Sequence, residues 1–183
     1  MYYSTTFLNG DEKLKEKGLE TLKSVRNDLN FFLNFCTMTL REVLEKLKEF
    51  GTDIDISEYY DLNDPDDEET YEMDLESLLD DLINSSLYDN LVEIIENEFS
   101  NYGLCFDYVE DGSEYNPDEP YFRYQIAWGG PSYEIRFYEN GFIEFAYLDW
   151  YVGVGFDVSN DSVFSDLYEY FRELGLLNFE KEI

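Results

Sequence analysis

The sequence contains no histidine, and its 12 Lys and Arg residues face 43 Asp and Glu residues. Without an imidazole the chain cannot form a Ser-His-Asp or Cys-His catalytic group, or a zinc site with histidine ligands. The formal net charge of -31 disfavours binding to nucleic acid, to nucleotides or to an anionic membrane by charge attraction. These absences favour a positively charged partner.

Cysteines and long apolar runs are also scarce. Cys36 and Cys105 do not form a CxxC pair, so we expect buried thiols in a reducing compartment rather than a disulfide. The first residues lack the basic and apolar regions of a signal peptide, and no apolar run approaches the ~18 residues of a membrane span. The sequence therefore predicts a cytoplasmic protein with no membrane partner.

The composition is nevertheless that of a folded protein. Hydrophobic residues make up 44% of the 183 positions and aromatic residues 19%. This is enough to form a hydrophobic core in one compact domain, or in one domain with a small appendage. The chain is therefore not expected to be a disordered acidic tail.

The negative charge is concentrated in one part of the chain. Residues 1–50 contain eight basic and eight acidic side chains, and residues 123–183 contain four basic and eleven acidic ones. Residues 51–122 contain 24 acidic side chains and no basic one. A random distribution of the basic residues would leave such a gap only rarely, so the middle segment is a candidate for function.

The N-terminal part is expected to be helical. Apolar residues recur at spacings of three and four over residues 12–36, which predicts an amphipathic helix. Thr39 and Glu42 have the spacing of a capping box, so a second helix should start after Thr39 and end at Gly51. Residues 1–50 are therefore interpreted as a helical hairpin.

The acidic part, residues 51–103, is expected to combine a loop and helices. Pro65 and a dense run of like charges disfavour regular structure over residues 52–73, so this stretch is predicted to be an exposed loop. One helix is expected after Asp74, and another between Ser86 and Gly103.

From residue 104 the apolar pattern changes towards a period of two, which is typical of β-strands. A final segment, residues 160–175, returns to helical spacing and should cover one face of the sheet. The predicted fold is α+β, with a four-stranded antiparallel sheet and a C-terminal helix over residues 104–183. The predicted strands are residues 104–109, 121–128, 133–138 and 142–148.

The predicted hairpin around residues 139–141 allows two registers. A two-residue turn would place Phe137 opposite Glu144, whereas a three-residue loop aligns Arg136 with Glu144. The opposite charges favour the three-residue loop, with Gly141 at positive φ.

The first functional hypothesis is mimicry of nucleic acid by carboxylates. Twenty-four carboxylates equal the charge of about 12 base pairs of duplex DNA, or roughly 40 Å of its length. Like charges four residues apart, such as Glu72 and Glu76, destabilise a helix. An electric field of a single sign along this segment therefore lowers the stability of its helices. The alternative is an ordinary solvated acidic surface. The candidate partner-binding residues are Asp64, Asp66, Asp67, Glu68, Glu69, Glu72, Glu76, Asp80, Asp81, Asp89, Glu93 and Glu96.

Metal or acid-base chemistry is a second hypothesis. Asp53, Asp55 and Ser57 resemble the first ligands of a calcium loop, but Glu58 stands where glycine is needed and Asp64 where a bidentate Glu is needed. Among 43 carboxylates, some pairs will come together by chance, so no catalytic pair can be identified. We therefore expect no metal or cofactor, leave the catalytic residues unassigned, and favour a binding protein over an enzyme.

A third candidate is a cluster of aromatic residues. Trp128, Tyr133, Trp150 and Tyr151 lie in stretches rich in glycine and could form an exposed ledge that anchors a partner. The alternative is that these rings belong to the core beside hairpin turns. The sequence does not decide between the two.

Residues 124–159 resemble the core of uncharacterised proteins carried by plasmids, in which a strand ends in Trp-Gly-Gly-Pro and an Asp-Trp element follows. The matching residues are Trp128, Gly129, Gly130, Pro131, Asp149 and Trp150. The resemblance implies an origin on a mobile element, and in composition the whole chain resembles acidic anti-restriction and anti-CRISPR proteins.

Charge and resemblance together predict an inhibitor of a host nucleic-acid-dependent defence enzyme, such as a CRISPR or restriction nuclease. The expected partner is a basic nucleic-acid-binding protein, bound through its basic groove, and no direct binding of nucleic acid is expected. One alternative is an immunity protein that neutralises a basic toxin nuclease. Another is a nuclease or hydrolase that uses carboxylate-bound metal.

Overall fold

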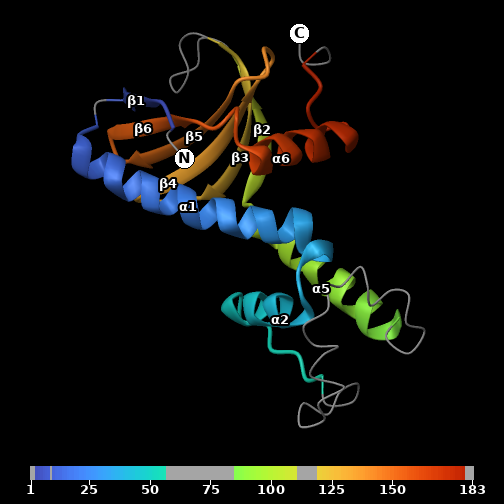
Figure 1. Ribbon diagram of the computed structural model, residues 1–183. Helices are drawn as coiled ribbons and strands as arrows, with labels where there is room; N and C mark the ends of the chain where they lie inside the picture. The colour runs from blue at the N-terminus through green and yellow to red at the C-terminus, as the bar shows by residue number, and fades with distance from the viewer. Residues whose placement is uncertain (1–2, 9, 57–84, 111–118, 180–183) are drawn as a thin grey trace. The chain divides into compact units, whose positions relative to one another are not determined.

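The computed structural model describes residues 3–8, 10–56, 85–110 and 119–179 (Figure 1). The chain divides into two compact units. The sheet unit comprises Met1–Leu29 and Tyr102–Ile183, and the helical unit comprises Asn30–Asn101. These units do not coincide with the three sequence segments, because helices α1 (Glu12–Asn34) and α5 (Ser85–Tyr102) each begin in one unit and end in the other.

The sheet has six antiparallel strands in the order β1-β6-β5-β4-β3-β2. Five strands come from the C-terminal half of the chain, and β1 pairs with β6 at the edge. The predicted α+β fold is confirmed, as are its four strands, whereas β1 and β6 were not predicted. The strands are β1 (Thr5–Leu8), β2 (Cys105–Val109), β3 (Tyr121–Ala127), β4 (Ser132–Tyr138), β5 (Ile143–Asp149) and β6 (Val152–Asp157).

The register of the β4–β5 hairpin agrees with the prediction. Arg136 lies opposite Glu144, and the amide of Tyr138 donates to the carbonyl of Phe142, which leaves a three-residue loop. Gly141 in this loop has a φ of 82°, a conformation that glycine adopts at little cost. The turn chemistry thus fixes which side chains of β4 and β5 share a face.

Helices α1 and α6 (Ser162–Glu173) pack on the same face of the sheet (Figure 1). On α6 the ring of Phe171 lies 5.8 Å from that of Phe137. Gly18 of α1 packs so closely that an added Cβ would come within 2.9 Å of the Phe156 side chain. The strand register places Phe137 and Phe156 on one face, so this face forms the apolar core and the prediction of a covering C-terminal helix is confirmed.

Asp161 joins the start of α6 to α1. Its buried carboxylate caps α6 by accepting from the amide of Val163 at 3.1 Å, and it accepts from Arg26 Nε at 2.7 Å and from the Tyr3 hydroxyl at 2.7 Å. Burial alone would raise the pKa of Asp161, but the bonds from Arg26, Tyr3 and Val163 outweigh it and lower the pKa. The ionised carboxylate therefore stabilises the native state.

Replacing Asp161 with asparagine should lower the free energy of unfolding by about 1 to 3 kcal/mol at pH 7. Asparagine still caps a helix, so the loss reports mainly the charge-assisted bonds to Arg26 and Tyr3. Because the native pKa lies below the unfolded value of about 3.9, this stability is present above pH ~4 and is lost as the pH falls through the native pKa. Urea unfolding across this pH range tests the expectation, and the exposed Asp166→Asn provides a control that should change little.

The helical unit is built around phenylalanine rings. Phe32, near the end of α1, stacks on Phe50 at 5.1 Å and on Phe99 of α5 at 5.1 Å between ring centroids. Helix α2 (Leu40–Glu49) begins at the capping box of Thr39 and Glu42, as predicted. Helix α5 confirms the helix predicted between residues 86 and 103.

No helix among the described residues is long and apolar enough to cross a membrane.

Candidate functional site

The face of the sheet opposite α1 and α6 carries a groove of about 860 Å³ that strands β2 to β6 line. Side chains alternate between the two faces of a strand, so the register that buries Phe137 and Phe156 turns their charged neighbours towards this groove. The volume of the groove lies in the range of typical ligand sites.

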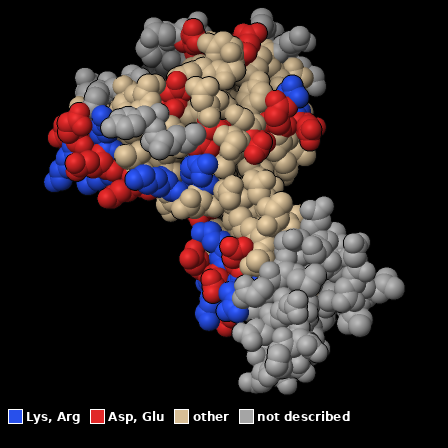
Figure 2. Space-filling model, viewed as in Figure 1, with Lys and Arg blue, Asp and Glu red and all other residues tan. Residues whose placement is uncertain are grey.

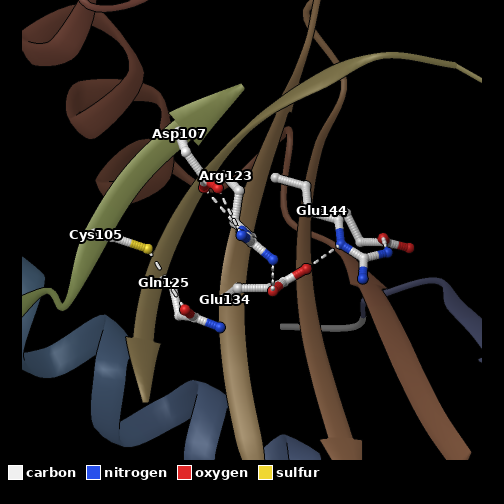
Figure 3. A network of polar contacts seen from close by, with 7 residues as sticks. Cys105, Asp107, Arg123, Gln125, Glu134 and Glu144 are labelled. Carbon is white, nitrogen blue, oxygen red and sulfur yellow. Dashed lines mark hydrogen bonds and ion pairs between the residues drawn. The ribbon is translucent and has the colours of Figure 1, made fainter. Parts of the chain in front are cut away.

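A chain of charged side chains crosses this face of the sheet (Figure 3). It forms the floor of the groove, which Arg123, Glu134 and Arg136 line. Asp107 of β2 accepts two hydrogen bonds from Arg123 of β3, at 2.9 and 2.6 Å. On β4, Glu134 lies 4.0 Å from Arg123 and accepts from Arg136 Nε at 2.7 Å. Arg136 Nη1 then donates to Glu144 of β5 at 3.0 Å. The network therefore crosses four strands, with carboxylates and guanidinium groups in alternation.

The central members of this network are buried. Glu134 is 2% exposed, and Arg136 and Glu144 are each 7% exposed. Burial acts to lower the pKa of Arg136, but the neighbouring carboxylates outweigh it, so its pKa is raised and it stays charged. Burial raises the pKa of Glu144, although Arg136 opposes this shift. Arg136 thus compensates the charge of Glu144 and, together with the more distant Arg123, the charge of Glu134.

The neighbouring strand leaves room for the Glu144 carboxylate. An added Cβ at Gly155 of β6 would lie 2.1 Å from Glu144 Oε1, well inside contact distance. Glycine at this position is therefore a condition for the buried ion pair between Glu144 and Arg136.

Tyr121 also lines the groove, at the start of β3. Its ring lies under the Arg136 guanidinium, with 5.1 Å between the guanidinium carbon and the ring centroid. The residue is 0% exposed, and its hydroxyl has no hydrogen-bond partner within the described residues. Burial raises the pKa of this hydroxyl, so it is neutral at pH 7. An unpaired buried hydroxyl is unusual and leaves one oxygen able to accept a bond.

Exposed aromatic rings form the rim of the groove at one end. Trp128 is 72% exposed, Trp150 is 83% exposed and Tyr151 is 92% exposed. The indole of Trp150 lies against Gly130, where a Cβ would come within 3.0 Å of Nε1. The turn between β3 and β4 and the turn between β5 and β6 thus meet here, bringing the Trp-Gly-Gly-Pro and Asp-Trp residues together. We call Trp128, Trp150 and Tyr151 the aromatic rim.

The predicted aromatic residues separate in the structure. Three of them form the aromatic rim, whereas Tyr133 turns to the helix-covered face, where its ring lies 6.1 Å from that of Phe145. Because side chains alternate along β4, Tyr133 lies on the same face of the sheet as Ile135, and Glu134 lies on the other face. The two tryptophans lie at turns, where this rule does not apply, so their exposure could not be predicted.

Three predicted acidic partner-binding residues lie on α5. Asp89, Glu93 and Glu96 are exposed there, and the buried side of the helix carries Leu91 and Ile95. The other nine lie outside the described residues, as do most of the predicted loop and the helix after Asp74. They are Asp64, Asp66, Asp67, Glu68, Glu69, Glu72, Glu76, Asp80 and Asp81.

The cysteines form no disulfide, but the expectation that both are buried is wrong. Cys36 is half-buried, while Cys105 is exposed and donates from Sγ to Gln125 Oε1 at 3.4 Å. Cys105 lies at the start of the outermost strand, β2, where only one neighbouring strand covers it.

The floor network was not predicted as a site. One part of it is indicated by the sequence, namely the pairing of Arg136 with Glu144 in the predicted hairpin. Asp107 and Arg123 are separated by a long connection, so their pairing could not be derived from a short turn. Among the described residues, no group of three or more Cys, Asp or Glu side chains has a geometry that could hold a metal ion.

A scan against protein-family models finds no match, and searches of the curated proteins and of the solved structures find none either.

Proposed function

We propose that this protein inhibits a basic, nucleic-acid-dependent defence enzyme by occupying its nucleic-acid groove with carboxylates. The observation that carries the proposal is the absence of Lys and Arg from residues 51–122, which hold 24 acidic residues. A surface selected only for solubility usually mixes charges of both signs. A one-signed field instead accelerates encounter with an oppositely charged partner and sets the orientation of docking.

Helix α5 supports the proposal because it carries this charge on a folded element. Asp89, Glu93 and Glu96 follow one another at spacings of four and three, so they lie along one side of the helix. Their repulsion weakens the isolated helix by a few tenths of a kcal/mol per pair, which the buried apolar side offsets. The carboxylates are thus held as a row on a structured surface.

The arginines of the sheet unit do little to offset the field. Arg26 is paired with Asp161, Arg123 with Asp107, and Arg136 with Glu134 and Glu144. Positive charge is present on α1, where Lys and Arg side chains lie among acidic ones (Figure 2). This mixed surface contrasts with α5, which contains no basic residue, and provides a natural control.

To test the proposal, the protein is immobilised, proteins are captured from a bacterial lysate at low salt, and the retained protein is identified. We expect a basic nucleic-acid-binding protein that is released between 0.1 and 1 M salt, as the screening length falls from ~10 to ~3 Å. If it is a nuclease, its activity should fall on addition of the chain. Retention of neutral or acidic proteins, or retention that salt does not weaken, would contradict the proposal.

Reversal of Asp89, Glu93 and Glu96 to lysine should weaken binding of the captured protein by at least about tenfold. The three changes alter the charge of α5 by six units, while the exposed positions allow the helix to fold. Circular dichroism checks the fold, and fluorescence anisotropy at 0.15 M salt measures the dissociation constant.

A matched triple reversal of Glu12, Glu16 and Glu20 on α1 changes the net charge equally in the mixed region and should weaken binding less. Equal loss in both triple variants would mean that only net charge matters. In that case the acidic segment would have no special role.

A further inference from the structure

We propose that the groove on the open face of the sheet binds an arginine-bearing segment of the basic partner, with a guanidinium stacked on the aromatic rim. This inference rests on the proposed function for the identity of the partner as a basic protein. The groove would be a second recognition element, which distinguishes partners by the chemistry of a side chain and not by net charge alone.

The aromatic rim supplies the first argument. Both tryptophans of the chain lie at this one groove, and each is more than two-thirds exposed. Exposed tryptophans grouped at the edge of a hollow are unusual for a surface that contacts only water, and tryptophan is enriched at the energetic centres of interfaces. The rim is therefore suited to covering a bound group with the faces of its rings.

The charge of the groove selects a cation. Glu110 and Glu134 line the groove together with Arg123 and Arg136, and Asp107 and Glu144 are the ion-pair partners of these two arginines. The carboxylates are in excess, and the net charge of the chain repels phosphate and other anions. Aromatic faces attract cations, most strongly those of tryptophan. A bound cation would thus meet the rings and the negative field together.

Arginine fits this groove better than lysine. Its planar guanidinium stacks on aromatic rings and donates five N–H groups without accepting any bond. The exposed carboxylate of Glu110 lines the groove and can accept these bonds. The volume of about 860 Å³ exceeds one side chain, so a short peptide segment that carries the arginine can enter.

Because both tryptophans lie on the rim, their fluorescence reports directly on the groove. The probe is a short peptide of alternating arginine and glycine, compared with a lysine peptide of equal charge and a neutral citrulline peptide. The arginine peptide should shift the tryptophan emission to shorter wavelength and protect it from acrylamide. The lysine peptide should bind at least about threefold more weakly, and the citrulline peptide should produce no shift.

Trp128→Ala and Trp150→Ala should each weaken binding of the arginine peptide about five- to tenfold, measured by anisotropy of a labelled peptide. Both positions are exposed, so the melting temperature should stay close to that of the wild type. Leu174→Ala provides a control, since this side chain is 57% exposed at the end of α6, away from the groove, and its loss should not change binding.

Three outcomes would overturn the inference: full affinity in the Trp128→Ala and Trp150→Ala variants, equal binding of the arginine and lysine peptides, or binding of the citrulline peptide. Binding of the captured basic protein to the variants distinguishes failure of this inference from failure of the proposed function. If the α5 reversal abolishes its binding while both tryptophan variants retain it, the groove inference is wrong and the proposed function stands. If no basic protein is captured, the proposed function is wrong whatever the peptides do.

Discussion

Replacing Arg136 with methionine is expected to lower the free energy of unfolding by about 3 to 5 kcal/mol at pH 7. The substitution leaves Glu144 buried without its counter-charge, and leaves Glu134 with only the longer contact to Arg123 at 4.0 Å. Removal of one partner from a buried ion pair is costly because the remaining charge loses its compensation. For comparison, Arg172→Met removes an exposed pair with Glu169 on α6 and should cost no more than about 1 kcal/mol.

The destabilisation by Arg136→Met should also depend on pH. Burial already raises the pKa of Glu144 in the wild type, and loss of Arg136 raises it further. A group with a raised native pKa favours the native state below its unfolded pKa, and this contribution is lost as the pH rises through the native value. The deficit of the variant should therefore shrink between pH 7 and pH 5 in urea unfolding experiments.

A triple variant guards against the case in which Arg136→Met does not fold. Combining it with Glu134→Gln and Glu144→Gln removes every charge of the central network, and it should recover most of the lost stability. A single variant as stable as the wild type, or a deficit that grows towards pH 5, would show that the network does not depend on Arg136.

Gly155→Ala is expected to lower the free energy of unfolding by about 1 to 3 kcal/mol, the range for overpacking a tight interior site. The added Cβ would lie 2.1 Å from Glu144 Oε1 and 2.7 Å from its Cδ. Glu144 cannot move away freely because its carboxylate is held by Arg136. The added methyl group should thus disturb the ion pair between Glu144 and Arg136 as well as the packing around it.

A double-mutant cycle tests this origin. In a Glu144→Ala background the clash disappears while Arg136 keeps Glu134, so Gly155→Ala should then cost less than about 1 kcal/mol. If Gly155→Ala lowers the free energy of unfolding equally in both backgrounds, the destabilisation comes from the backbone of β6 and not from the contact with Glu144.

Gly155 also explains why the sequence failed to predict β6. Glycine lowers strand propensity, so the two glycines of Val152–Asp157 weaken the strand pattern of this segment. In the structure Gly155 makes room for Glu144, so it marks a close approach within a strand. Strand β1 was missed because four residues near the N-terminus carry too little periodicity.

Elements with local signals were predicted well. The helix after Thr39 is set by its capping box, and the β4–β5 hairpin by Gly141 and the opposite charges of Arg136 and Glu144. The groove could not be predicted, because it depends on the pairing of β2 with β3 and on two turns that meet through Trp150 and Gly130. The exposure of a turn residue depends on such distant neighbours and not on its own sequence.

The acidic segment and the groove support one account, in which charge attracts a basic partner and the aromatic rim recognises its arginines. A competition titration decides whether the protein occupies the nucleic-acid groove of its partner. Duplex DNA is added to the complex of the protein with the captured basic partner, and release is followed by anisotropy of the labelled protein. Mimicry predicts that DNA displaces the protein completely, and that the two ligands never share the partner. A ternary complex, or no release at saturating DNA, would contradict it.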